Sequence, residues 1–499
     1  MKLFERLHGT SGIKIIVGSA FFWAWLDAMF MSAFFVPSGS QGFMSEVATI
    51  YVFAFSVPGF ILAMTKNTPV RTILASKKAL MGTAILGTAG SLLYLLAGYH
   101  HSWLVLVVGG LCAGVFMTAY QLGWGSAYCK EGARSATPYV AGGFAGAILI
   151  DIPLLFMVPE ASAIFFALLP LISGIFLVLI DPADRTYRPY REPLSDSRKT
   201  IFSSLKTYLG ISIMILAAVM LVAISFGYMQ HLMSFSSIMS GDAMGGILIQ
   251  VVRGLTAIAV FVLVVLASGR SSIVYRIGLL AMIAGFMMMS FLFRTDYFWV
   301  SGAVIIGGYT VFDLLIWVVV SQSAYAQSHN ALKTISVMRL IAILCYVVGA
   351  VIGILFVGNA ETLNEFVSAE TTVVGYLVVI AVVLLLSSED VWVLLGGARA
   401  LRKPDNEGDA ATQNKRLEAW FTKFGLTARE KEIATLLAYG RTQPWVAKHL
   451  NISENTVGTH VRHIYQKAEV HNRQQFIDVV SSDISLESRD NEKEVTDNT

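Results

Sequence analysis

Apolar runs long enough to cross a lipid bilayer follow one another from residue 13 to about residue 397. A spanning helix needs about 20 mostly apolar residues. The longest loop between the runs, residues 181–206, divides them into halves at 1–180 and 207–397. We therefore expect an all-α fold, with a polytopic membrane bundle of twelve helices in two six-helix halves. The predicted spans are 13–36, 44–64, 78–99, 103–127, 138–158, 160–180, 207–229, 243–267, 273–293, 297–320, 336–357 and 371–395.

From residue 398 the pattern changes to the mixed polar and apolar composition of a soluble domain. Four short segments there carry apolar residues at helical spacing. Thr427 and Glu430 stand in capping-box register before the first segment, and Ser453 stands where it can cap the third. The short turn between the second and third segments is typical of a helix-turn-helix. We expect a four-helix domain at residues 425–482, followed by a disordered acidic tail at 483–499. The segment before it, 398–424, is expected to be a juxtamembrane linker, flexible to about residue 414 and ending in a short amphipathic helix with Leu417, Trp420 and Phe421.

This C-terminal segment resembles the LuxR-type (NarL/FixJ) DNA-binding domain. The matching residues are Leu426, Thr427, Arg429, Glu430, Leu450, Ile452, Ser453, Thr456, Val457, His460, Ile464 and Lys467. The resemblance implies that the third helix lies in the major groove of double-stranded promoter DNA, with the protein bound as a homodimer.

By the same resemblance, Gly458, Thr459 and Arg462 face the bases, and Thr456, His460 and Lys467 lie near phosphates. Gly458 departs from the family pattern, which usually has lysine at that position. The loss of this cation makes Arg462 the main expected base contact, because its guanidinium can bridge guanine O6 and N7.

The membrane part resembles the major facilitator superfamily in layout, with twelve spans in two halves and a long central loop. The charged signature that such transporters usually carry between spans two and three is missing, since LAMTKNTPVRTILASKKAL holds neither Asp-Arg nor Gly. This departure weakens the interpretation as a secondary transporter. A sensor of a small molecule is the stronger interpretation.

Lysine and arginine gather in the loops on one side of the predicted bundle. Lys78, Arg134, Arg276 and Arg339 fall on that side, as does the arginine-rich loop 181–206, whereas Arg294 stands on the other. By the positive-inside rule the basic side is cytoplasmic. We expect a bacterial inner-membrane protein with both termini in the cytoplasm.

Four ionisable residues fall inside predicted spans, namely Asp27, Asp151, Arg253 and Asp313. Charges at membrane depth are costly and usually face a cavity or a partner. One interpretation is a ligand site in which Arg253 holds an anionic group while Asp27 or Asp313 accepts hydrogen bonds. The alternative is that Arg253 pairs with an aspartate and joins the two halves. Candidates for the aromatic walls of a pocket are Trp23, Trp25, Trp124 and Trp317.

Composition adds little to this picture. The three cysteines, Cys112, Cys129 and Cys345, show neither paired spacing nor histidines nearby, so the sequence predicts neither disulfide nor metal site nor cofactor. It also shows no nucleophile–base pair, which favours a non-enzyme. We therefore expect a membrane-bound one-component regulator, and a major-facilitator transporter with an added DNA-binding domain is the alternative.

Overall fold

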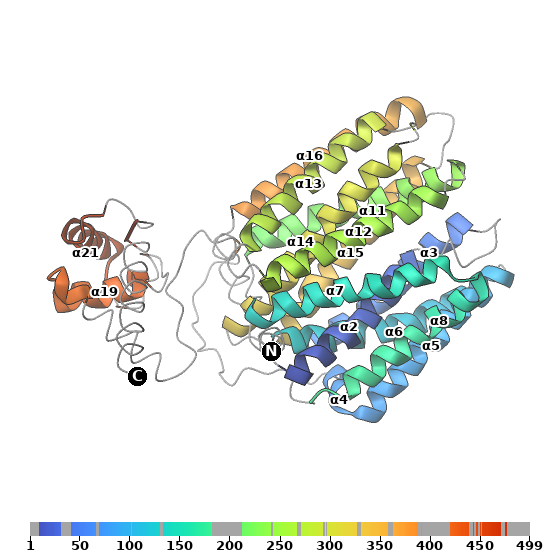
Figure 1. Cartoon of the computed structure of the whole chain (residues 1–499), viewed down its shortest axis with the longest axis horizontal. Coiled ribbons are helices and arrows are strands. Elements are labelled where there is room, and N and C mark those ends of the chain that lie inside the picture. The colour runs from blue at the N-terminus through green and yellow to red at the C-terminus, as the bar shows by residue number, and fades with distance from the viewer. Residues whose placement is uncertain are drawn as a thin grey trace, which may run out of the picture. The chain divides into compact units, whose positions relative to one another are not determined.

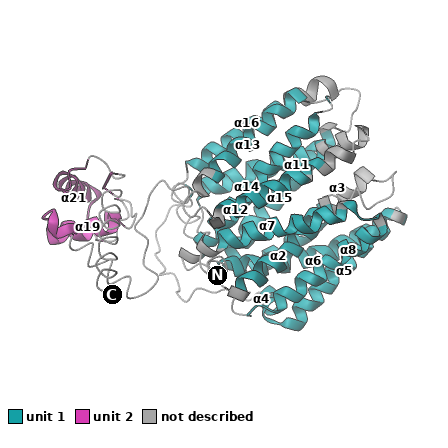
Figure 2. Ribbon diagram, viewed as in Figure 1, with its two compact units in different colours: residues 1–391 teal, residues 392–499 magenta. Residues whose placement is uncertain are grey.

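The long apolar runs of the sequence become long helices, and the chain divides into two units, residues 1–391 and 392–499 (Figure 2). In this computed structural model no strand occurs among the described residues, so the predicted all-α class is confirmed. The described residues are 9–30, 41–65, 69–100, 102–129, 133–181, 212–240, 243–266, 271–292, 295, 297–326, 331–357, 363–387, 391, 420–438, 443, 446–447, 450, 452–470 and 475–476.

Each predicted span overlaps one long helix of unit 1 (Figure 1). The first half holds α2 (Gly9–Phe30), α3 (Gln41–Ala63), α5 (Lys77–His100), α6 (Trp103–Tyr128), α7 (Ala133–Phe156) and α8 (Pro159–Val178), with the short α4 (Pro69–Ala75) before α5. The second half holds α11 (Ile213–Ser240), α12 (Ala243–Leu266), α13 (Ser271–Leu292), α14 (Phe298–Ala326), α15 (Ala331–Val357) and α16 (Leu363–Leu386).

The two halves repeat one packing order. In the first half α2 packs on α7 and α8, α5 packs on α6 and α8, and α3 packs on α6. In the second half α11 packs on α15 and α16, α13 packs on α14 and α16, and α12 packs on α14. Each of these five contacts of the first half therefore has its counterpart in the second. The halves meet where α7 contacts α12 and α14, and where α3 contacts α15.

Glycines allow the closest of these helix contacts. A Cβ atom at Gly227 on α11 would collide with the carbonyl oxygen of Tyr346, and one at Gly349 on α15 would collide with that of Ile224. Small residues let backbones approach in a medium where the hydrophobic effect does not drive helices together. The α11–α15 pair therefore depends on glycine at both positions.

The helices of unit 1 have the length and the surface of membrane spans. Within the described part of the chain, nine helices are long and apolar enough to cross a membrane. Three further apolar helices are shorter, namely Thr49–Ala63, Val251–Leu263 and Thr372–Leu386. Large apolar side chains also point outward, as Leu104 does with 74% of its surface exposed and Leu280 with 64%. A soluble domain rarely exposes so much apolar surface. The chain is thus a multi-pass membrane protein.

Unit 2 is built on a small helical core of its own. It includes α19 (Ala428–Ala438) and α21 (Glu454–Lys467), which pack against each other. The apolar faces predicted from helical spacing are confirmed, because Ile433, Val457 and Ile464 are fully buried. Of the remaining predictions, the linker 398–419, loop residues 182–206, the start of the fourth helix at Asn472 and the tail 483–499 lie outside the described residues.

The core of unit 2 begins before residue 425. Trp420 and Phe421, on the amphipathic stretch expected at the end of segment 398–424, are 4% and 1% exposed and belong to the buried cluster. The Trp420 ring packs against Phe476, with centroids 5.7 Å apart. The last residues before α19 are therefore part of the folded domain.

Candidate functional site

Helix α21 has one buried face and one polar face. Val457, Val461 and Ile464 point into the core, whereas Thr459 and Arg462 are exposed. Of the other predicted contacts, Thr456 is also exposed, and Gly458 and His460 are half-buried. An amphipathic helix that keeps its polar face free has the form required of a recognition helix.

The start of α21 is fixed by the predicted cap. Ser453 Oγ accepts a hydrogen bond from the Thr456 amide at 3.1 Å, as expected of an N-cap serine. The hydroxyls of Ser453 and Thr456 are 2.8 Å apart, and Thr459 Oγ1 donates to the Asn455 carbonyl at 3.0 Å. These local bonds order the first turns of the helix before any partner binds.

The space beside Gly458, where a side chain would stand, is not filled by a neighbouring described residue. The nearest atom to a Cβ built there is Gln443 Oε1, at 3.8 Å, which is ordinary van der Waals distance. Among the described residues, no close approach of another group therefore explains the glycine. A Cβ atom would meet no clash with them at this position.

Lys467 is engaged within the domain. Its Nζ atom lies 2.6 Å from Glu430 Oε2 and donates to the Gly425 carbonyl at 3.2 Å. Glu430 Oε2 also accepts the Thr427 amide at 2.8 Å, while the Glu430 amide donates to Thr427 Oγ1 at 3.3 Å, so the predicted capping box is confirmed. Lys467 thus ties the end of α21 to the start of α19. Its contact with a phosphate stays a prediction.

Glu430 is charged in the folded domain. Burial by itself would raise the pKa of Glu430. The hydrogen bonds from Lys467 and Thr427, together with the positive charge of Lys467, outweigh burial and hold the pKa below its ordinary value of 4.5. The Glu430–Lys467 contact is therefore an ion pair at neutral pH.

The second candidate site is a cavity of about 100 Å³ inside unit 1. Helices of both halves form its walls. The lining residues come from α2, α3, α6 and α7 of the first half and from α11, α12, α14 and α15 of the second. The polar and charged lining residues are Asp27, Gln121, Gln230, Arg253, Tyr309, Thr310, Asp313, Arg339 and Tyr346.

Two of the four membrane-depth charges form an ion pair between the halves. Arg253 Nη2 on α12 lies 2.7 Å from Asp27 Oδ1 on α2. Both residues also line the cavity. The sequence left open whether Arg253 belongs to a ligand site or joins the two halves. Its pair with Asp27 does join the halves, and the same pair forms part of the cavity wall.

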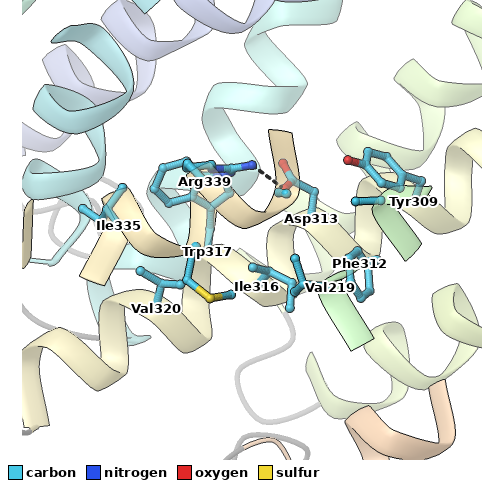
Figure 3. A pocket seen from close by; sticks show the side chains of 12 residues that line it. Val219, Tyr309, Phe312, Asp313, Ile316, Trp317, Val320, Ile335 and Arg339 are labelled. Carbon is cyan, nitrogen blue, oxygen red and sulfur yellow. Dashed lines mark hydrogen bonds and ion pairs between the residues drawn. The ribbon is translucent and has the colours of Figure 1, made fainter. Parts of the chain in front are cut away.

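Asp313 pairs with a residue that the sequence had assigned to an inner loop. Arg339 Nη1 on α15 lies 3.1 Å from Asp313 Oδ1, and its guanidinium stacks 4.1 Å above the centre of the Trp317 ring (Figure 3). A small adjoining cavity of about 20 Å³ shares this wall. Counting Arg339 with the loop charges was wrong. Its position inside the predicted span 336–357 was the available signal.

Tyr309 lies among all the charged groups of the cavity. Its hydroxyl is within electrostatic range of Asp27, Arg253, Asp313 and Arg339. The ring stacks on Phe226, with centroids 3.8 Å apart and planes inclined by 8°. The cavity thus combines two ion pairs with an aromatic wall.

Several polar atoms around the cavity have no hydrogen-bond partner among the described residues. They are Gln121 Oε1, Arg339 Nη2 and Trp317 Nε1, all of them buried. An unsatisfied buried polar atom typically costs about 1–3 kcal/mol. A ligand or a water molecule that reached these atoms would recover that cost.

Other candidates from the sequence lie outside the cavity lining. Asp151 on α7 is 3% exposed, with both carboxyl oxygens unpartnered among the described residues, and it is within electrostatic range of Asp27 and Arg253. Trp25 donates to Ser91 and Trp124 to Ser173, so these rings pack between helices. Trp23 lines the larger cavity and Trp317 the adjoining one, so two of the four predicted tryptophans lie at a pocket.

Comparison with known proteins agrees with the geometry of unit 2. Residues 425–480 match the family model described as "Bacterial regulatory proteins, luxR family". The chain carries a luxR-type domain. Helices α19 and α21 both lie within the matched residues.

Two bacterial regulators are similar in the same region. The monoamine regulon transcriptional regulator of Klebsiella aerogenes is 42% identical over 52 residues, which are 10% of this chain and 23% of that protein. The HTH-type transcriptional regulator YhjB of Escherichia coli (strain K12) is 44% identical over 50 residues, 10% of this chain and 25% of that protein. The chain thus spans about a quarter of the length of these curated relatives.

Solved structures similar to the chain include a Major Facilitator Superfamily (MFS) transporter, FucP, in the outward conformation. The identity is 12%, the TM-score is 0.46, and the match covers 74% of this chain and 96% of that one.

Proposed function

We propose that this protein is a membrane-bound, one-component transcription regulator of bacteria. Unit 1 binds a small molecule in its cavity, and the luxR-type domain binds double-stranded promoter DNA as a homodimer. The observation that carries the proposal is the union, in one chain, of an exposed recognition helix with a multi-pass membrane unit that encloses a charged cavity. Neither half of the proposal requires catalysis or a cofactor.

On the DNA side, we assign base contacts to Arg462, Thr459 and the backbone around Gly458, since they lie on the polar face of α21. Thr456 and His460 approach phosphates from the same helix. Lys467 stabilises the fold through its ion pair with Glu430, and we assign it a phosphate contact in addition to that pair. A lone domain with few cations binds DNA weakly, which favours dimerisation on a two-fold site.

On the ligand side, we assign contacts to Asp27, Arg253 and Asp313, and we add Arg339. Asp151 was also a candidate for ligand contact, but it lies outside the cavity lining, so we assign it no direct contact. We place the domain boundaries at 1–397, 398–424, 425–482 and 483–499, with the core of the third reaching back to Trp420. Both termini lie on the cytoplasmic side of the bacterial inner membrane, the side on which promoter DNA lies.

Selection of bound DNA from a random pool tests the regulator function. Full-length protein in lipid nanodiscs should enrich one sequence with two-fold symmetry, and the Arg462→Ala variant should not. A reporter placed behind that sequence then shows whether the cavity carries the signal. Asp27→Asn and Arg253→Gln should keep DNA binding but change the response of the reporter to small metabolites. If no sequence is enriched, the regulator function is rejected.

A transporter with an appended regulatory domain is the second candidate. The observation that favours it is the cavity enclosed by two halves that repeat one packing order. Uptake into liposomes separates the candidates. Substrate flux that is lost in Asp27→Asn or Asp313→Asn would support transport, whereas ligand-dependent reporter output without flux would exclude it.

A further inference from the structure

We infer that the cavity of unit 1 selects an uncharged, flat aromatic molecule with hydrogen-bonding groups at both ends, and discriminates against organic anions and cations of the same shape. This inference rests on the proposed sensor function, whose ligand it describes. It follows from three features of the cavity wall, which are the balance of charge, the aromatic rings and the unpartnered polar atoms.

The charges that line the cavity cancel. The formally charged residues in the described lining are Asp27, Arg253, Asp313 and Arg339. Each carboxylate lies beside a guanidinium, at 2.7 Å in one pair and 3.1 Å in the other. A ligand with a net charge would either stay without a counter-ion or have to displace one partner of a pair. Both outcomes leave an uncompensated charge in a buried place, which is the costly case.

Aromatic rings supply much of the remaining wall. Phe226 and Tyr309 form a stacked pair on one side, and Phe53 lies against Tyr346 with centroids 5.0 Å apart. Trp23 and Phe144 meet edge to face at 4.9 Å. All six line the cavity. A flat aromatic ligand can add to both the stacked and the edge-to-face contacts, whereas an aliphatic one of equal volume cannot.

Two polar atoms of the cavity-lining residues could be satisfied by a ligand that carries one hydrogen-bond donor and one acceptor. Gln121 Oε1 on α6 lacks a donor and Arg339 Nη2 on α15 lacks an acceptor among the described residues. Both residues line the cavity, and they belong to different halves. A ligand with a hydroxyl or amide at each end can satisfy both atoms and so connect the halves. Since both atoms lie buried in the wall, the wall must yield slightly as the ligand enters.

Three matched probes test the inference, namely 4-hydroxybenzamide, 4-hydroxybenzoate and 4-hydroxybenzylammonium. They share one ring and one hydroxyl and differ mainly in charge. Binding to full-length protein in lipid nanodiscs is measured by the shift in thermal unfolding and by quenching of tryptophan fluorescence. The neutral amide should bind about tenfold more tightly than either ion, which corresponds to about 1.4 kcal/mol.

Charge variants should reverse this preference in a predictable direction. Asp27→Asn leaves one guanidinium unbalanced and should make the benzoate the best probe. Arg253→Gln leaves one carboxylate unbalanced and should make the benzylammonium the best probe. Glu160→Gln is the matched control, because it makes the same change of charge on an exposed residue at the start of α8. Asp313→Asn and Arg339→Gln repeat the test if the first pair of variants does not fold.

The inference is overturned if the wild-type protein prefers either ion, if the amide does not bind at millimolar concentration, or if the variants keep the wild-type order. It is also overturned if Asp151→Asn shifts the order as Asp27→Asn does, because a third carboxylate would then enter the balance. The sensor function is judged separately by the reporter. If a charged probe bound most tightly and also changed reporter output, the preference for an uncharged ligand would be rejected, whereas the sensor function would be supported.

Discussion

Arg253 on α12 and Asp27 on α2 form a 2.7 Å ion pair that connects the two halves of the membrane unit. The side chains are 17% and 6% exposed, so water screens the pair weakly. The other pair, Asp313 with Arg339, joins neighbouring helices of the second half. A ligand that competes for Arg253 would therefore loosen the contact between halves, whereas one that competes for Arg339 would act within one half.

Removal of both partners of this inter-half pair should destabilise the membrane unit by less than the sum of the two single removals. Asp27→Ala leaves a buried guanidinium without its carboxylate, and the expected loss is about 3–5 kcal/mol. The double variant Asp27→Ala/Arg253→Ala should lose less than the sum of the single losses. Thermal unfolding of purified protein measures both. Glu160→Ala on the exposed start of α8 is the control, and strictly additive losses would show that the pair does not interact.

The Glu430–Lys467 pair should make the stability of the DNA-binding domain depend on pH. Because the pKa of Glu430 is lowered in the folded state, its stabilisation is complete above 4.5 and is lost as the pH falls through the folded value. Glu430→Gln should cost about 1 kcal/mol at neutral pH and progressively less in acid. Urea unfolding of residues 408–499 across this range measures the difference. A cost that stayed constant with pH would show that the charge of Glu430 contributes nothing.

Local patterns carried most of what the sequence predicted. The caps at Thr427 and Ser453 and the buried face of α21 follow from residues within one or two turns of each other, so they are visible in the sequence. Span positions follow in the same way, because the bilayer imposes an apolar run on each helix. These features do not depend on which helices become neighbours.

Contacts between residues far apart in the sequence could not be predicted from local patterns. Asp27 and Arg253 were both recognised as costly charges, yet the sequence left open whether they bind each other or a ligand. Arg339 was missed because the charge rule counts arginines near helix ends as loop residues, whereas here a neighbouring aspartate and the Trp317 ring hold the guanidinium at a cavity. The task of Lys467 inside the domain likewise depends on the fold that brings α19 beside the end of α21.

Arg462→Ala should abolish sequence-specific DNA binding without unfolding the domain. Arg462 is exposed on α21, so truncation removes no core contact, and the loss of a bidentate base contact costs about 1–3 kcal/mol of discrimination. Competition between the selected sequence and random DNA measures the loss. Gln466→Ala, another exposed position of α21, is the control and should change discrimination little. Unchanged discrimination in Arg462→Ala would place base reading elsewhere.

Gly458→Lys should strengthen DNA binding. The space around Gly458 admits a side chain, since the nearest atom to an added Cβ is Gln443 Oε1 at 3.8 Å. A lysine there adds one cation to the polar face of α21, so affinity should rise and the slope of log K against log salt should steepen by about one. Gly458→Ala separates the two effects, because it gains up to about 1 kcal/mol of helix stability without the charge. If Gly458→Lys raised stability as Gly458→Ala does but left the salt slope unchanged, residue 458 would not face the DNA, and the docking of α21 inferred from the luxR-type domain would have to be turned about the helix axis.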